Sequence, residues 1–209
     1  MQNVITPDLK GIAEGKGAKT SPNLSLTWID DGMGKPALKV QPTKQEFAVE
    51  DKWIVLLNGI AFTNGVIEFD ALGQSAPPQS NFLGIAFHAV DDGTHDAIYF
   101  RPFNFRAEDR ERKIHAVQYV SHPDYPWFDL RKEQPGKYEQ PIDPAPDGDA
   151  WFHARIVVEW PRVRVYVNAA KEPSLVVDAL SDRQDQGIGL WVGPGKGGYF
   201  ANLTIQPAS

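Results

Sequence analysis

Residues 151–170 most restrict the possible folds of this chain, because they read as a β-hairpin. In WFHARIVVEWPRVRVYVNAA every second side chain is apolar on both sides of the Trp160-Pro161 dipeptide. This period of two is typical of a strand with one buried face, and a proline between two such runs favours a turn. We therefore predict that alternate residues of the hairpin face a core, namely Phe152, Ala154, Ile156, Val158, Val163, Val165 and Val167.

Short apolar runs separated by Gly, Pro and Asp clusters recur along the rest of the chain. About a dozen strand-like segments, with no amphipathic helix between them, are typical of sheets that pack on each other. The pattern predicts an all-β fold, an antiparallel β-sandwich with jelly-roll or Greek-key connections. Outside the hairpin the strand-like segments include LSLTWI, ALKVQP, EFAV, WIVLLNGIAF, GVIEFDALG, FLGIAFHAV, DAIYF, HAVQYVS, SLVVDAL, GIGLWVG and YFANLTI.

The length and composition indicate one domain. A chain of 209 residues with 42% hydrophobic content is long enough for one large core. Residues 1–22 are rich in Gly, Lys and Ser and show no period, which predicts a tail or a strand along a sheet edge. Residues 23–209 are expected to form a single β-sandwich domain.

Charge and missing residue types limit the expected partners. The net charge is −6, and the basic run at 106–113 is interleaved with acids, so we expect no nucleic acid and no membrane partner. The lack of cysteine excludes disulfides, thiol catalysis and cysteine-based zinc sites. MQNVITPDLKG lacks the pattern of a signal peptide, but the location stays unknown: it is extracellular or periplasmic if such a peptide was removed, and otherwise cytoplasmic. The oligomeric state stays open.

Residues 81–104 combine two strand-like runs with many polar groups. In NFLGIAFHAVDDGTHDAIYFRPFN the alternation places small residues beside His88, Tyr99 and Arg101. Small residues around polar ones are typical of a ligand groove, although a half-solvated sheet face would show the same pattern. The core side is expected to carry Leu83, Ile85, Phe87, Ala89, Ile98 and Phe100, and the groove side Gly84, Ala86, His88, Ala97, Tyr99 and Arg101.

The chain between residues 99 and 131 concentrates groups that suit a sugar. Aromatic rings stack on the C–H faces of sugars, and planar polar side chains bond their hydroxyls. Residues 122–149 contain many prolines and no period, which predicts a long functional loop. The same residue types would also suit the closed end of a sandwich. The predicted substrate-binding residues are Tyr99, Asn104, Gln118, Tyr119, Tyr125, Trp127 and Arg131.

No motif in the sequence requires a cofactor. DDGTHD at 91–96 offers three carboxylates around a glycine, which would suit Ca²⁺ or an ordinary polar turn. The five histidines show no recognised zinc spacing, but ligands in a sandwich can come from neighbouring strands. His88 and His115 are the pair that we consider first, and the identity of any metal stays unknown.

The C-terminal part of the chain resembles a known fold family. A hairpin that opens with Trp, followed by GIGLWVGPGKGGYFANLTI, is similar to the strand order of the concanavalin A-like lectin/glucanase superfamily. As a pattern, the similarity covers roughly residues 60–207. The resemblance implies a concanavalin A-like jelly roll.

Two further strands narrow this resemblance. FLGIAFH resembles the N-S-G-I-x-F-R strand of the 3-keto-disaccharide hydrolase domain family, described as glycoside hydrolase family 16-like, with His88 at the position of the Arg. GVIEFDALG is similar to the E-x-D-x-x-E strand of the family 16 glucanases, with Glu68 and Asp70 at the first two positions and Gly73 at the third. Retaining hydrolysis needs two carboxyl groups roughly 5 Å apart, so this strand supplies only part of the set.

Together these features predict a carbohydrate-active domain that binds a saccharide on a concave sheet face built from residues 65–73, 82–90 and 96–104. A non-catalytic lectin-like module and a protein-interaction module remain alternatives. If the chain is an enzyme, the resemblance implies a glycoside hydrolase or lyase acting on a modified glycoside, with a histidine as general base and Arg101 stabilising negative charge. The candidate catalytic residues are His88, His115, His122, Arg101, Glu68 and Asp70.

Overall fold

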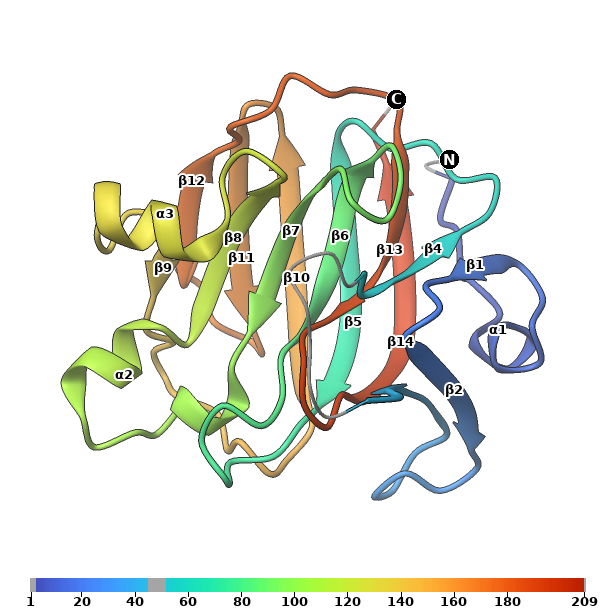
Figure 1. Cartoon of the computed structure of the whole chain (residues 1–209), viewed down its shortest axis with the longest axis horizontal. Coiled ribbons are helices and arrows are strands. Elements are labelled where there is room, and N and C mark those ends of the chain that lie inside the picture. The colour runs from blue at the N-terminus through green and yellow to red at the C-terminus, as the bar shows by residue number, and fades with distance from the viewer. Residues whose placement is uncertain (1–2, 45–51, 209) are drawn as a thin grey trace.

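The computed structural model describes residues 3–44 and 52–208 and shows a sandwich of two antiparallel β-sheets (Figure 1). Each sheet has seven strands. We name them the β7 sheet, which faces the viewer in Figure 1, and the β5 sheet, which lies behind it. The predicted all-β, jelly-roll-like sandwich is confirmed.

The strand bounds follow in the order of the strands across each sheet. The β7 sheet consists of β1 (Ala18–Thr20), β4 (Ile54–Leu57), β13 (Gly187–Val192), β6 (Leu83–Ala89), β7 (His95–Phe100), β8 (Val117–His122) and β9 (Glu139–Gln140). The β5 sheet consists of β12 (Leu175–Asp178), β11 (Arg162–Val167), β10 (Phe152–Glu159), β5 (Gly65–Leu72), β14 (Gly198–Pro207), β3 (Ala37–Pro42) and β2 (Leu24–Ile29).

The core lies between the inner faces of the two sheets. Phe100 of β7 packs against Phe69 of β5 and Phe152 of β10, with ring centroids 6.3 and 5.1 Å apart. All three rings are buried. Because burying one such side chain contributes ~1.5–3 kcal/mol, these contacts between the sheets are a main source of stability.

The predicted hairpin forms β10 and β11. Val158 lies opposite Val163, and the chain turns at Trp160-Pro161 between them. All the alternate residues predicted to face the core are buried. The alternation therefore gave the correct buried face for both strands.

Short helices lie outside the sheets, where the sequence predicted none: α1 (Leu9–Ala13), η1 (Pro102–Asn104), α2 (Arg110–Ile114) and α3 (Trp127–Glu133). α2 buries no side chain and α3 buries only Leu130. Helices this short and exposed leave no apolar period in the sequence, which explains the wrong prediction. Within residues 3–44 and 52–208, none of the helices has the length and apolar character needed to cross a bilayer.

The first part of the chain contacts both sheets. Ile5 forms a bridge with Ile205 of β14, and β1 pairs with β4 at one edge of the β7 sheet. WIVLLNGIAF forms β4 and a turn, after which Phe62 makes a bridge with Gln186. The predicted strand EFAV lies outside the described residues. The long segment predicted as a loop contains α3 and the two-residue strand β9.

Candidate functional site

The strand order separates the three strands of the predicted groove. β6 and β7 are neighbours in the β7 sheet, but β5 lies between β10 and β14 in the other sheet. The prediction of one concave face built from residues 65–73, 82–90 and 96–104 is therefore wrong. Alternation shows which side chains face the core, but it does not show which strands pair.

The alternation predicted His88 on the groove side of β6, but its side chain lies on the core side. Its φ is +50°, and the pairing of β6 with β13 shifts register at this point, as in a β-bulge. Its Nδ1 lies 2.9 Å from Oδ2 of Asp96, which pairs with the core-facing Phe87. The bulge interrupts the alternation, and this explains the error.

His88 and Asp96 form a fully buried ion pair. Nε2 of His88 lies 2.8 Å from the Thr63 carbonyl, so both ring nitrogens face an oxygen of the protein. Asp96 also accepts hydrogen bonds from Ser181 Oγ (2.6 Å) and Arg183 Nη2 (2.8 Å). Burial raises the pKa of Asp96, but the hydrogen bonds from His88 and Ser181 outweigh it, so this pKa lies below its usual range.

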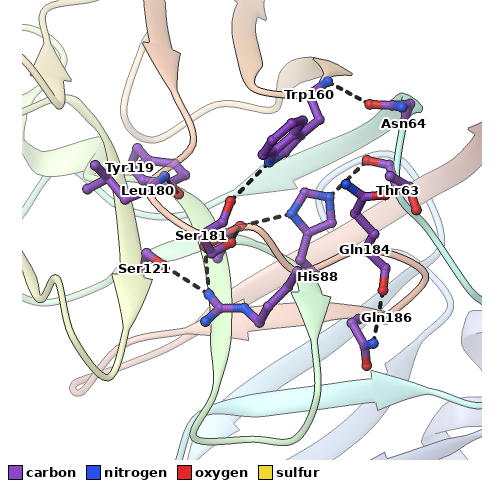
Figure 2. A network of polar contacts seen from close by, with 12 residues as sticks. Thr63, Asn64, His88, Tyr119, Ser121, Trp160, Leu180, Ser181, Gln184 and Gln186 are labelled. Carbon is purple, nitrogen blue, oxygen red and sulfur yellow. Dashed lines mark hydrogen bonds and ion pairs between the residues drawn. The ribbon is translucent and has the colours of Figure 1, made fainter.

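This network fixes the segment between β12 and β13, which Figure 2 shows from close by. Trp160 Nε1 donates to the Ser181 carbonyl (3.0 Å), and Leu180 N donates to the Tyr119 hydroxyl (2.9 Å). Ser181 is thus bound through its backbone to the β10–β11 turn and through its hydroxyl to Asp96. The 179–183 segment is held rigidly against the end of the sandwich.

A surface groove of about 500 Å³ lies between this segment and the turn after β8. This volume is in the range of small-ligand sites. The turn is fixed because Ser121 and Tyr125 exchange two backbone hydrogen bonds of 3.1 and 2.7 Å. The groove is lined by Ser121, Asp124, Tyr125, Trp160, Ala179, Leu180, Ser181, Asp182 and Arg183.

The groove combines aromatic rings with charged side chains. Tyr125 and Trp160 are each 39% exposed. Within the described part of the chain, Asp124 and Asp182 make no hydrogen bond or ion pair, so their oxygens are free to accept. Exposed rings beside planar polar groups suit the C–H faces and hydroxyls of a sugar. Of the residues predicted for binding, only Tyr125 lines this groove.

Most of the other predicted residues gather on the outer side of the β7 sheet. Arg101 donates from Nη2 to the Tyr99 hydroxyl (2.7 Å) and to Gln118 Oε1 (2.6 Å). Its Nη1 donates to the backbone carbonyl of His115 (3.0 Å). We name this set, with Arg131 and Glu139, the Arg101 cluster.

Glu139 connects the Arg101 cluster to the surface. His115 Nδ1 lies 2.7 Å from its Oε2, and Arg131 donates to the same carboxylate from Nη2 (2.7 Å) and Nε. Arg131 also lies over the ring of Trp127, 4.8 Å from its centroid. No pattern in the sequence indicates Glu139, because β9 has only two residues and therefore no alternation.

The centre of the Arg101 cluster is closed to solvent. Tyr99, Arg101, Gln118 and Glu139 are at most 4% exposed. Burial raises the pKa of Tyr99 and lowers that of Arg101, whose guanidinium contacts no carboxylate among residues 3–44 and 52–208. The grouping of Tyr99, Arg101 and Gln118 matches the predicted face, but their role as ligand contacts stays a prediction.

The remaining predicted binding residues lie at the borders of these sites. Asn104 of η1 contacts the His115 carbonyl through Nδ2 at 3.4 Å. Tyr119 is fully buried and points to the Leu180 backbone, away from the Arg101 cluster. Trp127 is 44% exposed on α3, outside the groove.

Glu68 and Asp70 lie on the outer face of the β5 sheet, far from Arg101 in the fold. His153 of β10 lies 2.8 Å from Asp70 Oδ1 and 3.4 Å from Glu68 Oε1. Asp70 Oδ2 accepts from Lys35 Nζ (2.8 Å) and Asn202 Nδ2 (2.6 Å). The two carboxylates share one face, as the alternation predicted, but they do not meet the other candidate catalytic residues.

The residues considered for metal binding are separated as well. In DDGTHD, Asp91 accepts from the Gly93 backbone (2.8 Å), Asp92 from Ser21 (3.3 Å), and Asp96 belongs to the buried network. No group of three or more metal-ligating side chains occurs in residues 3–44 and 52–208. His88 and His115 are not neighbours, because β7 lies between β6 and β8.

Comparisons with known proteins show the fold alone. No protein-family model and no curated protein matches this chain. A structure of unknown function with a galectin-like fold from Bacillus subtilis is 12% identical, with a TM-score of 0.57, over 91% of this chain and 89% of that one. Carbohydrate binding module CBM66 from the same species is 11% identical, with a TM-score of 0.52, over 89% of this chain and 97% of that one.

A third similar structure is a putative glycosyl hydrolase from Parabacteroides distasonis. It is 14% identical, covers 100% of both chains and has a TM-score of 0.53. These neighbours confirm the two-sheet β-sandwich fold, and the wider resemblance to the concanavalin A-like superfamily stays a prediction. The resemblance to the 3-keto-disaccharide hydrolase family is not confirmed by them.

Proposed function

We propose that this chain is a saccharide-binding domain and that the groove between the 121–125 turn and the 179–183 segment is its site. The observation that carries this proposal is the pair of half-exposed rings, Tyr125 and Trp160, beside the unpaired carboxylates of Asp124 and Asp182. The carbohydrate-binding module and the putative glycosyl hydrolase among the similar structures support it.

The groove is organised before a ligand arrives. The buried network holds Ser181 and Arg183, and the Trp160 ring is fixed by its hydrogen bond to the Ser181 carbonyl. A sugar would stack on a ring while the free carboxylates accept from its hydroxyls. Because the Trp160 ring is already held in place, little conformational entropy is lost at this contact on binding.

We propose binding without cleavage, although the sequence also allowed a hydrolase or lyase. The candidate catalytic residues are distributed over four places: the buried network, the Arg101 cluster, the end of β8 where His122 lies beside His95, and the outer face of the β5 sheet. In the first two, the polar atoms of His88 and Arg101 are already bonded to protein groups and buried. General acid–base chemistry needs such groups within reach of one substrate.

Calorimetric titration with oligosaccharides selected on a glycan array tests the proposal. We expect Trp160→Ala and Tyr125→Ala each to weaken binding at least about tenfold, equivalent to ~1.4 kcal/mol. Trp127→Ala, which removes an exposed ring outside the groove, is the matched control and should leave affinity unchanged. Prolonged incubation followed by product analysis should return the oligosaccharide uncut.

Two results would contradict this function. The first is the absence of binding across neutral and acidic oligosaccharides. The second is equal affinity in the wild type and both groove variants. Because Trp160 also supports the 179–183 segment, Asp124→Asn and Asp182→Asn serve as milder variants that change only groove carboxylates.

Contact with another protein is a second candidate function. Trp127 and Phe128 of α3 are 44% and 51% exposed and lie edge to face with centroids 5.7 Å apart. Exposed aromatic pairs are typical of interface cores. If α3 joins two copies of this chain, light scattering should show an oligomer that dissociates on Trp127→Ala, while saccharide binding persists.

A further inference from the structure

His95 and His122 face each other across β7 and β8 on the outer side of the β7 sheet. They are direct cross-strand partners, and their ring centroids lie 5.1 Å apart with planes tilted by 46°. His95 is only 4% exposed, and neither of its ring nitrogens has a hydrogen-bond partner in the described structure. A buried polar group without a partner is unfavourable, so these nitrogens call for a ligand from outside the chain.

Neither His95 nor His122 forms an ion pair with a carboxylate within residues 3–44 and 52–208, so no protein anion competes for their ring nitrogens. In contrast, His88, His115 and His153 each contact a carboxylate.

The spacing of the pair fits a shared metal ion. Zinc binds imidazole nitrogen at about 2.0–2.1 Å in tetrahedral geometry, which places two ligating rings with centroids about 5 Å apart. The separation of 5.1 Å between His95 and His122 agrees with that value. Directly opposed residues on antiparallel strands bring their side chains this close without any change in the backbone.

We propose that His95 and His122 bind one divalent transition metal ion of the Zn²⁺, Ni²⁺ or Cu²⁺ class, each through one ring nitrogen. Imidazole ligands suit these ions, whereas Ca²⁺ and Mg²⁺ require oxygen. The other coordination positions are filled from solvent. Neither histidine lines the saccharide groove, so the proposed metal site is a separate site.

Two positive groups influence this site. Arg183 and Lys52 both lower the pKa of His95, whereas Asp96 raises it. Arg183 is paired with Asp96 at 2.8 Å, so its charge is largely offset. Lys52 lies beside Gly93, since a Cβ atom built on Gly93 would lie 2.8 Å from the Lys52 Nζ. Its charge opposes cation binding, and Lys52→Gln should therefore strengthen metal affinity.

Calorimetric titration of the whole chain with ZnCl₂ and NiCl₂ tests the proposal. We expect one saturable site, weakened at least about tenfold by either His95→Gln or His122→Gln, since even supporting contacts change metal affinity on that scale. His153→Gln is the matched control, because His153 is exposed beside two carboxylates and is the strongest competing surface ligand. It should leave the affinity unchanged.

Nitrogen NMR of the wild-type histidine rings gives a readout that needs no variant. Zn²⁺ should shift one ring nitrogen of His95 and one of His122 and leave those of His88 in place. The proposal is overturned if no saturable binding occurs up to millimolar metal, if both histidine variants retain wild-type affinity, or if His153→Gln abolishes binding. Because His122 is only partly buried, its variant tests the site even where His95→Gln fails to fold.

Discussion

Two histidine–aspartate pairs join neighbouring strands of this molecule, one inside the sandwich and one on its surface. The Nδ1–Oδ distance is 2.9 Å between His88 and Asp96 and 2.8 Å between His153 and Asp70. The side chains of the first pair are 0% and 0% exposed, and those of the second are 40% and 12% exposed. Nearly equal geometry therefore occurs in very different surroundings.

This difference determines what each pair does. Removing one partner of a buried pair leaves an uncompensated charge away from water, whereas water replaces a lost partner at the surface. Asp96 also fixes Ser181 and Arg183, which line the groove. The buried pair supports the fold and the groove, and the exposed pair stays available to solvent.

The largest expected effect comes from Asp96→Asn. The change removes the carboxylate that faces His88, Ser181 and Arg183, so we expect the free energy of unfolding to fall by about 3–5 kcal/mol. Urea denaturation followed by circular dichroism measures this loss. A loss below about 1 kcal/mol, the range of surface pairs, would show that burial does not distinguish the two pairs.

Ser181→Ala should have an intermediate effect. It removes one hydrogen bond to the ionised Asp96, which contributes about 1.5–3 kcal/mol, and it loosens one wall of the groove. We expect a matching loss in urea denaturation and weaker saccharide binding. The matched control is Ser75→Ala, which removes a hydroxyl bonded to the exposed carboxylate of Asp149. Equal losses in the two variants would contradict the comparison.

Asp70→Asn should have a smaller effect on stability. Its partners His153 and Lys35 are exposed enough for water to replace the lost charge, so we expect a loss of about 0.2–1 kcal/mol. A double-mutant cycle with His153→Gln measures the coupling directly. Coupling as large as the loss in Asp96→Asn would mean that this face is more constrained than its exposure indicates.

The same contrast explains which features the sequence could predict. The buried faces of the β10–β11 hairpin and the shared face of Glu68 and Asp70 follow from alternation, which is local. Alternation does not predict the side on which His88 lies, because a bulge with positive φ interrupts the period. It does not predict the partner strands of β5 either, since β10 and β14 are far from β5 in sequence.

The groove was difficult to predict for a similar reason. Its walls come from the turn after β8, the β10–β11 turn and the segment after β12, which meet only in the folded chain. The residue type of Tyr125 predicts a role in binding a sugar, whereas the sequence indicates Trp160 only as part of a turn. Arg183 and Asp182 lie in a segment without any period, so no local signal identifies them.

The smallest expected effect is the pH dependence contributed by Asp70. Burial raises its pKa, but hydrogen bonds from Lys35, His153 and Asn202 outweigh this, so the folded pKa lies below 3.8. The unfolded chain therefore takes up the proton first as pH falls, and the stabilisation is present above about pH 3.8 and lost as pH falls through the folded pKa. The difference in unfolding free energy between wild type and Asp70→Asn should shrink as the pH falls below about 3.8. A difference that grows on acidification would mean that Asp70 is not held as a carboxylate by these donors.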